Sequence, residues 1–392
     1  MIPASWRPGG SRTGARWRSR LASAVVVGGG VFGASLAHRL VSSGWDVTLV
    51  EQYAPGHVRA ASGGESRLIR CSHGAADWYT RSAWRALELW KELERESGTE
   101  LFVPSGVAWF FRNSQGWGAE SERVLREQGI PVERLSPQEA ERLFPSFAGE
   151  GLASVLYEPE AGVLRARDAT RVISEQAIAR GAQFVAGAAA PDGESVVVGG
   201  ERLEADHVVW ACGAWLAQLF PDLVDLRVTR QDVYFFGAPP EWQAPSVPGW
   251  VDFEGGVYGI GDLDGRGFKA SPDREGPAFD PDSDDRVASD DKEREAREYL
   301  ALRFPALADA PLVGTRSCPY SLTADTNFLI APHPEHERVW LLGGGSGHGF
   351  KHGPALAEYV QGLLEGAESP DPSFALGPRP PGGGLRAPWI ET

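Results

Sequence analysis

Apolar and polar positions near the start of the chain predict a strand, a helix and a second strand. Residues 24–27 form a short run rich in valine, residues 34–41 have the character of a helix that Gly44 ends, and residues 46–50 form a second apolar run. This order is typical of a parallel βαβ unit. We therefore expect the fold to begin with an α/β unit.

The same pattern returns in two later parts of the chain. An amphipathic helix is predicted at 168–180, and a strand at 339–342 is followed by a helix at 354–364. Further strands are predicted at 182–185, 195–198, 201–203 and 207–210, of which the second and third form a hairpin. We expect both parts to return to the sheet of the first unit.

A different pattern separates these parts. Aromatic-rich strands are predicted at 101–111, 231–236, 249–253 and 257–260. Turn clusters such as Ala238-Pro239-Pro240 separate them, which favours an antiparallel sheet in a second domain. We interpret most of these aromatic residues as core. An acidic loop at 280–291 leads into a helix at 291–303, which is expected to be a solvated surface.

Glycines follow the first strand with the spacing of a dinucleotide-binding turn. The pattern G-x-G-x-x-G falls on Gly28, Gly30 and Gly33, and Glu51 ends the second strand about 20 residues later. Gly28 permits the tight turn, Gly30 lets the backbone approach a pyrophosphate, and Gly33 lets the helix pack closely on the strands. Glu51 is placed to accept hydrogen bonds from the adenosine ribose. The alternative is a glycine-rich turn without a ligand, and the motif alone does not separate FAD from NAD.

A second glycine-rich turn near the end of the chain favours FAD. The strand at 339–342 runs into Gly343–Lys351, and a helix follows. An extended FAD needs a second helix N-terminus at its flavin end, whereas a simple NAD dehydrogenase does not. The dipole of that helix, with Lys351 close by, would stabilise the anionic reduced flavin.

These patterns predict an α/β fold with an FAD-binding Rossmann-type (glutathione-reductase-like) domain and a second, antiparallel-sheet substrate domain. The FAD-binding domain is expected to comprise residues 21–103, 162–228 and 325–378, and the substrate domain residues 104–161 and 229–324. Residues 1–20 contain five arginines and no acidic residue. Because they lack an apolar segment, we interpret them as a disordered extension, with a targeting segment as the alternative.

Composition narrows the class of protein further. The formal net charge is −15 over 392 residues, which argues against nucleic acid as a partner. No stretch reaches the roughly 18–20 apolar residues that span a bilayer. Three cysteines, Cys71, Cys212 and Cys318, do not make a disulfide framework, so a cytoplasmic location is expected.

Several motifs together resemble the monomeric sarcosine oxidase family of the D-amino-acid oxidase superfamily. They are the first glycine turn, Gly64-Glu65-Ser66-Arg67-Leu68-Ile69-Arg70, Lys269 after Gly267-Phe268, Cys318-Pro319-Tyr320, and Ser346-Gly347-His348-Gly349-Phe350-Lys351. The resemblance covers about residues 21–375, and the last motif is its most specific part. The chain has only four lysines, and Lys269 and Lys351 both fall at family positions.

The resemblance implies charged residues at a substrate site. Arg70 and Lys351 correspond to the pair that holds the substrate carboxylate, a role that suits a guanidinium and an ammonium in a dry pocket. Lys269 and Arg67 correspond to the cationic pair beside the flavin, where the lysine activates O2 by stabilising superoxide as it forms. Without the resemblance, the sequence around Arg70 favours a surface strand arginine.

The resemblance also implies residues that contact the cofactor. Cys318 corresponds to a cysteine that forms a thioether to the flavin, although a lone cysteine is also commonly a buried free thiol. Tyr258 and Tyr320 are expected as pocket walls, with core packing as the alternative. The full set of predicted cofactor-binding residues is Gly28, Gly30, Val31, Phe32, Gly33, Glu51, Ser62, Arg67, Gly213, Cys318, Gly347, Gly349, Phe350 and Lys351, and no metal ligand is predicted.

Two positions depart from the family pattern. Members that act on sarcosine commonly carry a histidine where this chain has Gly63, and another where it has Asp273. Loss of the first imidazole is expected to enlarge the pocket. Asp273, if it points inward, is expected to pair with a second cationic group on the substrate.

The resulting hypothesis is an FAD-dependent oxidase of an amino acid, or of a secondary or N-alkylated amine that carries a carboxylate. A hydride passes from the alpha or N-alkyl carbon to flavin N5, and O2 takes the electrons to give H2O2. The alternatives are an amine dehydrogenase with a non-oxygen acceptor and a non-catalytic flavin-binding protein, while an NAD dehydrogenase is disfavoured by the second glycine turn. A monomer or a small homo-oligomer is expected.

Overall fold

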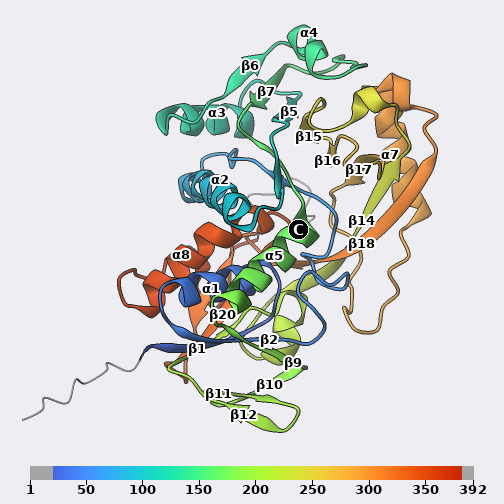
Figure 1. Cartoon of the computed structure of the whole chain (residues 1–392). Coiled ribbons are helices and arrows are strands. Elements are labelled where there is room, and N and C mark those ends of the chain that lie inside the picture. The colour runs from blue at the N-terminus through green and yellow to red at the C-terminus, as the bar shows by residue number, and fades with distance from the viewer. Residues whose placement is uncertain (1–20, 382–392) are drawn as a thin grey trace, which may run out of the picture.

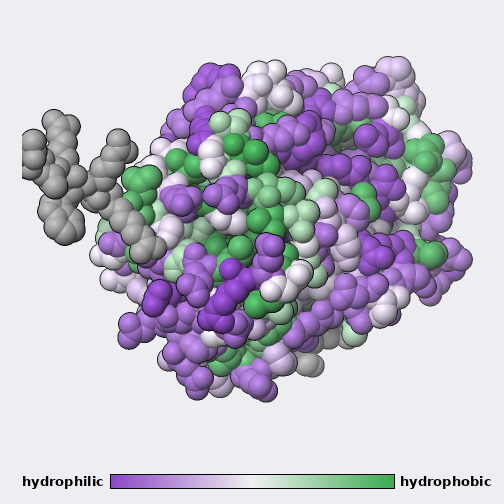
Figure 2. All heavy atoms as spheres, turned by 60° about the horizontal axis from the view of Figure 1, so that its bottom comes forward, coloured by the Kyte–Doolittle hydropathy of each residue, from purple (hydrophilic) through white to green (hydrophobic). Residues whose placement is uncertain are grey.

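The computed structural model describes residues 21–381 and contains two large sheets (Figure 1). The predicted extension at residues 1–20 lies outside this range. Within it, no helix is long and apolar enough to cross a membrane. The face seen in Figure 2 is mainly hydrophilic, with smaller hydrophobic areas between the hydrophilic residues.

The first large sheet has six strands in the order β19-β20-β13-β1-β2-β9. Its strands are β1 (Ser23–Val27), β2 (Asp46–Glu51), β9 (Gln183–Ala186), β13 (His207–Trp210), β19 (Leu329–Pro332) and β20 (Val339–Gly343). All neighbours are parallel except β19 and β20. The three chain segments predicted for the FAD-binding domain therefore do meet in one sheet, as the pattern of residues required.

Both faces of this sheet are covered, which explains its unbroken apolar strands. Ala24 and Val26 face a core shared with α1 (Val31–Ser42) and α8 (Gly353–Leu364). Val25 and Val27 face the opposite core, which includes Val196 of the small sheet β10-β11-β12. The strands of that sheet are β10 (Ala189–Asp192), β11 (Ser195–Val198) and β12 (Glu201–Leu203), and α5 (Ala166–Ala179) packs beside α1.

The second large sheet has eight strands in the order β18-β14-β17-β16-β15-β5-β7-β6. Its strands are β5 (Val107–Phe111), β6 (Glu133–Leu135), β7 (Ser154–Glu158), β14 (Arg227–Phe236), β15 (Gly249–Asp252), β16 (Val257–Ile260), β17 (Phe268–Pro272) and β18 (Leu312–Leu322). An aromatic core containing Trp250, Phe268 and Phe304 packs this sheet against α7 (Asp290–Arg303). The interpretation of these aromatic residues as core is confirmed.

The remaining strands and α-helices of residues 21–381 are a small sheet and four helices. A three-stranded sheet has the order β3-β8-β4, from β3 (Arg67–Ile69), β4 (Phe102–Val103) and β8 (Gly162–Leu164). The other helices are α2 (Asp77–Ser97), α3 (Trp117–Glu127), α4 (Pro137–Ala140) and α6 (Leu216–Leu219). Of these, α2 lies beside α8 (Figure 1).

Two details of the sequence prediction need correction. The single strand predicted at 101–111 is two strands in different sheets, because Pro104 and Gly106, which has φ of 72°, interrupt it. The second sheet is also not wholly antiparallel, since β15 and β5 are parallel neighbours. The α/β class with one largely parallel and one largely antiparallel sheet is confirmed, while the exact domain boundaries stay a prediction.

Candidate active site

A cavity of about 450 Å³ is lined by residues from both glycine turns and from the eight-stranded sheet. The predicted site residues that line it are Gly28, Gly30, Val31, Phe32, Glu51, Ser62, Arg67, Arg70, Gly213, Tyr258, Tyr320, Gly347, Gly349, Phe350 and Lys351. Gly33, Lys269 and Cys318 do not line it, and each lies behind a residue that does. The structure thus brings together residues that are more than 300 positions apart in the chain.

The first glycine turn leaves no room for side chains at two of its three positions. Gly28 has φ of 107°, and a Cβ there would lie 2.5 Å from the Ala211 carbonyl oxygen. A Cβ on Gly33 would lie 1.9 Å from the Gly28 carbonyl oxygen. At Gly30, by contrast, the nearest atom to such a Cβ is the Ser62 Oγ at 3.5 Å. Gly28 and Gly33 therefore serve the close packing of turn and helix, whereas Gly30 faces the cavity.

The start of α1 supplies hydrogen-bond donors to this end of the cavity, and the end of β2 supplies a carboxylate that accepts hydrogen bonds. The first N–H groups of a helix lack intrahelical partners, and the Val31 N–H donates to the Ser62 Oγ at 3.0 Å. Glu51 is held by the Gly29 N–H, which donates to its Oε2 at 2.6 Å. A dinucleotide needs N–H groups for its pyrophosphate and a carboxylate for its ribose. The residues present fit FAD at this end.

The second glycine turn packs directly on the first. Phe32 of α1 lies against Gly345 and Gly349, where a Cβ on Gly349 would lie 2.8 Å from the Phe32 ring. Ser346 takes φ of 44° and donates from Oγ to the Gly344 carbonyl oxygen. The glycines of the second turn thus let two helix starts approach the same cavity.

Arg67 on β3 is fixed against the backbone beside Cys318. Its Nη1 donates to the Ser66 carbonyl oxygen at 2.7 Å, and its Nη2 donates to the Ala61 carbonyl oxygen at 2.6 Å. The Cys318 Sγ lies 3.8 Å from Nη2. Burial lowers the pKa of Arg67, but the nearby thiol and the hydroxyls of Tyr258 and Tyr320 together raise it above its ordinary value.

Lys269 lies buried behind Tyr258. Tyr258 and Ile260 are two positions apart on β16, so their side chains point to the same face of the sheet. Because Ile260 pairs with Lys269 on β17, the lysine is a diagonal neighbour of the tyrosine on that face. Its Nζ lies 4.9 Å from the centre of the Tyr258 ring. Lys269 is 2% exposed, so its ammonium is kept from bulk water at the wall of the cavity.

Arg70, directly after β3, and Lys351, in the second glycine turn, both line the cavity. The Arg70 guanidinium carbon lies 4.8 Å from the centre of the Trp109 ring, and its Nη1 donates to the Ser72 carbonyl oxygen. Lys351 is buried and donates from Nζ to the His348 carbonyl oxygen at 2.9 Å. Burial and the positive charge of Arg70 hold the pKa of Lys351 well below its usual value. A carboxylate bound between them would relieve that cost.

Glu158 at the end of β7 was not predicted as part of this region. Its buried carboxylate accepts hydrogen bonds from the Cys71 and Ser72 backbone N–H groups, the Ser72 hydroxyl and the Trp109 indole. It therefore fixes both the chain that follows Arg70 and the ring on which Arg70 stacks. The only signal in the sequence is an acid that closes the apolar run of β7.

The two departures from the family pattern have different outcomes. Asp273 does line the cavity, and its backbone N–H donates to the Gly256 carbonyl oxygen. Gly63 does not, and a Cβ there would lie 2.1 Å from the His57 carbonyl oxygen. The expected enlargement of the pocket at Gly63 is therefore wrong, because that position faces the 57–58 backbone.

Comparisons with known proteins agree with this arrangement. The profile of the family described as FAD dependent oxidoreductase matches residues 23–363. Monomeric sarcosine oxidase from Bacillus sp. (strain B-0618) is 30% identical over 356 residues, which are 86% of this chain and 91% of that protein.

Solved structures share the fold at lower identity. L-proline dehydrogenase from P. horikoshii has a TM-score of 0.79 at 21% identity, covering 91% of this chain and 97% of that one. A modified fructosyl peptide oxidase from Aspergillus nidulans has a TM-score of 0.77 at 22% identity, covering 94% and 95%. From the matched family profile and the sarcosine oxidase relative, this chain belongs to the FAD dependent oxidoreductase family, and FAD is its cofactor.

Proposed function

We propose that the protein is an oxidase of an N-alkylated or secondary amine that carries a carboxylate, with O2 as the electron acceptor. The observation that carries this proposal is the position of two cations, Arg70 and Lys351, in the wall of the FAD cavity. The relative at 30% identity is named for sarcosine, an N-methylated amino acid, which supports the same substrate class.

Arg70 and Lys351 would anchor the substrate through its carboxylate. Arg70 is held in place by the Trp109 ring and the Ser72 carbonyl, and Lys351 by the His348 carbonyl. Charge-assisted hydrogen bonds in a buried site fix both position and orientation. The carbon next to the amine nitrogen would then be held at one place relative to the cofactor.

FAD, when bound, supplies the redox chemistry: it accepts the hydride from that carbon and passes two electrons on to O2 with two protons, giving H2O2, while water hydrolyses the imine. The protein itself excludes water. Trp109, Phe253, Tyr258 and Tyr320 present aromatic rings to the cavity. A neutral amine is favoured next to two cations, which is the form that can lose the hydride.

Lys269 and Arg67 would favour O2 as the acceptor. Both are fixed cations near Tyr258. Among the residues that the structure describes, neither forms an ion pair with a carboxylate. A fixed positive charge stabilises the superoxide that forms when O2 accepts its first electron. An amine dehydrogenase that uses another acceptor remains the second candidate, because one neighbour in fold is named as a dehydrogenase.

We also propose that Cys318 forms a thioether to the flavin. Its thiol lies beside Arg67, and its neighbours Pro319 and Tyr320 line the cavity. Denaturation in trichloroacetic acid tests this: yellow colour in the pellet, lost in Cys318→Ala, is expected, and yellow colour in the supernatant would show a non-covalent flavin. The cytoplasmic location and the monomeric or small homo-oligomeric state stay predictions. None of the three cysteines forms a disulfide within residues 21–381.

The substrate class is tested by turnover of matched amines. H2O2 release would be measured with a panel of N-methyl and cyclic secondary amino acids, and with the same amines lacking the carboxylate. We expect turnover only with the carboxylates. Because Asp273 lines the cavity, we expect carboxylates with a second cationic group to be preferred, and Asp273→Asn to abolish that preference. Equal turnover of amines with and without the carboxylate would contradict the proposal.

A further inference from the structure

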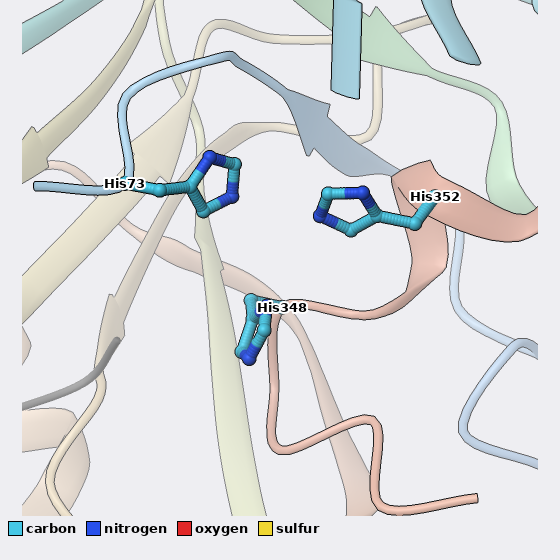
Figure 3. A group of neighbouring side chains, drawn as sticks. All are labelled: His73, His348 and His352. Atoms are coloured by element: carbon cyan, nitrogen blue, oxygen red, sulfur yellow. The ribbon is translucent and has the colours of Figure 1, made fainter. Parts of the chain in front are cut away.

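We propose that His73, His348 and His352 form a binding site for a borderline transition-metal cation such as Zn²⁺. His73 lies in the loop between β3 and α2, His348 in the second glycine turn, and His352 at the end of the short 3₁₀ helix before α8 (Figure 3). The proposal stands on these three side chains and does not depend on the proposed oxidase activity.

The three imidazoles face one another in the interior of the protein. Their exposed fractions are 1%, 6% and 0%. The ring centres of His73 and His352 are 5.3 Å apart, and one ring nitrogen from each of the three lies within 4.8 Å of the others. Imidazole nitrogens that converge in the protein interior from two segments, the loop at 73 and residues 348–352, are the donor set of a metal site.

Hydrogen bonds fix the tautomer of two of these rings. The His73 Nδ1 lies 2.9 Å from the Cys71 carbonyl oxygen, and the His348 Nε2 lies 2.9 Å from the Thr326 carbonyl oxygen. A carbonyl oxygen only accepts, so both nitrogens must carry hydrogen. The second nitrogen of each ring, Nε2 of His73 and Nδ1 of His348, then carries a lone pair. Such a bond from the far nitrogen to a carbonyl is typical of histidines that bind metals.

The third ring completes the set. The His352 Nδ1 lies 2.9 Å from the Ser82 Oγ, which can accept a hydrogen from it and so leave a lone pair on Nε2. The Nε2 atoms of His73 and His352 are buried and have no hydrogen-bond partner among residues 21–381. A buried polar atom without a partner costs free energy. A cation bound by both nitrogens would remove that cost.

The side chains in and around the histidine cluster determine which metal ion it can bind and with what affinity. Within residues 21–381, no carboxylate or thiolate joins the cluster, and three neutral imidazoles suit zinc, copper or nickel rather than calcium or magnesium. In a tetrahedral zinc site with Zn–N bonds of about 2.0–2.1 Å, nitrogens are about 3.4 Å apart, so the rings must turn inward. Arg70 and Lys351 lie close enough to oppose a cation, so we expect weaker binding than at a structural zinc site.

Zinc binding to the FAD-loaded protein provides the test. After equilibrium dialysis against Zn²⁺ and removal of excess ion, elemental analysis should find one zinc per chain in the natural sequence. His73→Phe and His352→Phe should each lose it, since each removes one ligand from a cluster already packed with aromatic rings. The double variant His333→Ala/His336→Ala is the matched control, because it removes a histidine pair that packs outside the cluster. It should keep its zinc.

Flavin absorbance of each variant reports whether the fold is intact. If the phenylalanine variants do not retain flavin, X-ray absorption at the zinc edge of the natural protein decides instead, and scattering from three imidazoles is expected. Absence of bound zinc, zinc that persists in both cluster variants with flavin retained, or a zinc spectrum with fewer than three imidazoles would overturn the proposal.

Discussion

The two ends of the cavity are built by opposite means. The dinucleotide end is made of backbone: a turn whose glycines exclude side chains, helix N–H groups and one carboxylate, all between residues 28 and 62. The proposed substrate end is made of charged side chains, with the partly buried Arg67 and Arg70 on β3 and at its end, and the buried Lys269 and Lys351 on β17 and in the second glycine turn. FAD binding at the first end should therefore be weakened by side chains that add volume, whereas the chemistry at the second end should be weakened by substitutions that remove a charge.

The largest effect is expected from a single methyl group in the first turn. In Gly33→Ala the new Cβ would lie 1.9 Å from the Gly28 carbonyl oxygen, so the turn must open and the protein should be isolated without flavin. Gly30→Ala is the matched control, because its nearest contact is 3.5 Å and its φ is −70°. It should keep the fold and bind FAD about tenfold more weakly, a difference of about 1.4 kcal/mol. Flavin content and thermal unfolding measure both, and equal behaviour would contradict the packing role of Gly33.

Lys269→Met should separate the two half-reactions. Loss of the buried charge is expected to slow the reaction with O2 by about 100- to 1000-fold. This is the usual effect of removing one group that stabilises the charge of a transition state. Reduction by the amine should change little. Stopped-flow measurement of each half-reaction gives the answer, and Lys91→Met, on an exposed lysine paired with Glu160, is the control. An unchanged oxygen reaction would favour the dehydrogenase alternative.

Lys351→Met should act on substrate binding. Loss of one charged hydrogen bond to a carboxylate costs about 2 kcal/mol, which is roughly a 30-fold weaker dissociation constant. Titration of the flavin spectrum with acetate, which has no amine, measures this without turnover. If the affinity for acetate stayed the same, Lys351 would not be a carboxylate anchor.

The smallest effect concerns pH. Because burial and Arg70 hold the pKa of Lys351 well below 10.5, the free protein loses this proton at a lower pH than an ordinary lysine. Acetate favours the charged lysine, so its affinity should be full below that pKa and fall above it, by up to about tenfold per pH unit. Lys351→Met should show no such fall over the same range. A parallel decline in the variant would assign the titration to another group.

Features of the molecule that depend on neighbouring residues in the chain were predicted better than features that join distant segments. The β11–β12 hairpin, whose strands flank Gly199-Gly200, depends on neighbours in the chain and was predicted with correct bounds, whereas α1 begins at Val31, three residues before its predicted start. The pairing of β5 with β15 joins residues 107 and 249 and leaves no local signal. Position 63 was misjudged because only the path of the 57–63 loop decides where it faces.

The sequence singled out charged residues that lie in or beside the cavity, but not the residues that support them, and their roles stay a prediction. Lysines are rare in this chain, so Lys269 and Lys351 could be singled out from motifs alone. Glu158 could not, because its role depends on four donors that lie 49 to 87 positions away along the chain. The same holds for His73 in the proposed metal site, which meets His348 and His352 only after folding, whereas those two lie four positions apart in the chain.

The most direct test of the proposed oxidase is anaerobic mixing of the purified protein with N-methyl and cyclic secondary amino acids, followed by admission of O2. The account predicts that at least one of these carboxylates bleaches the visible flavin absorbance, and that O2 restores it with release of one H2O2 per amine oxidised. Flavin that none of them bleaches, or that O2 fails to restore, would contradict it.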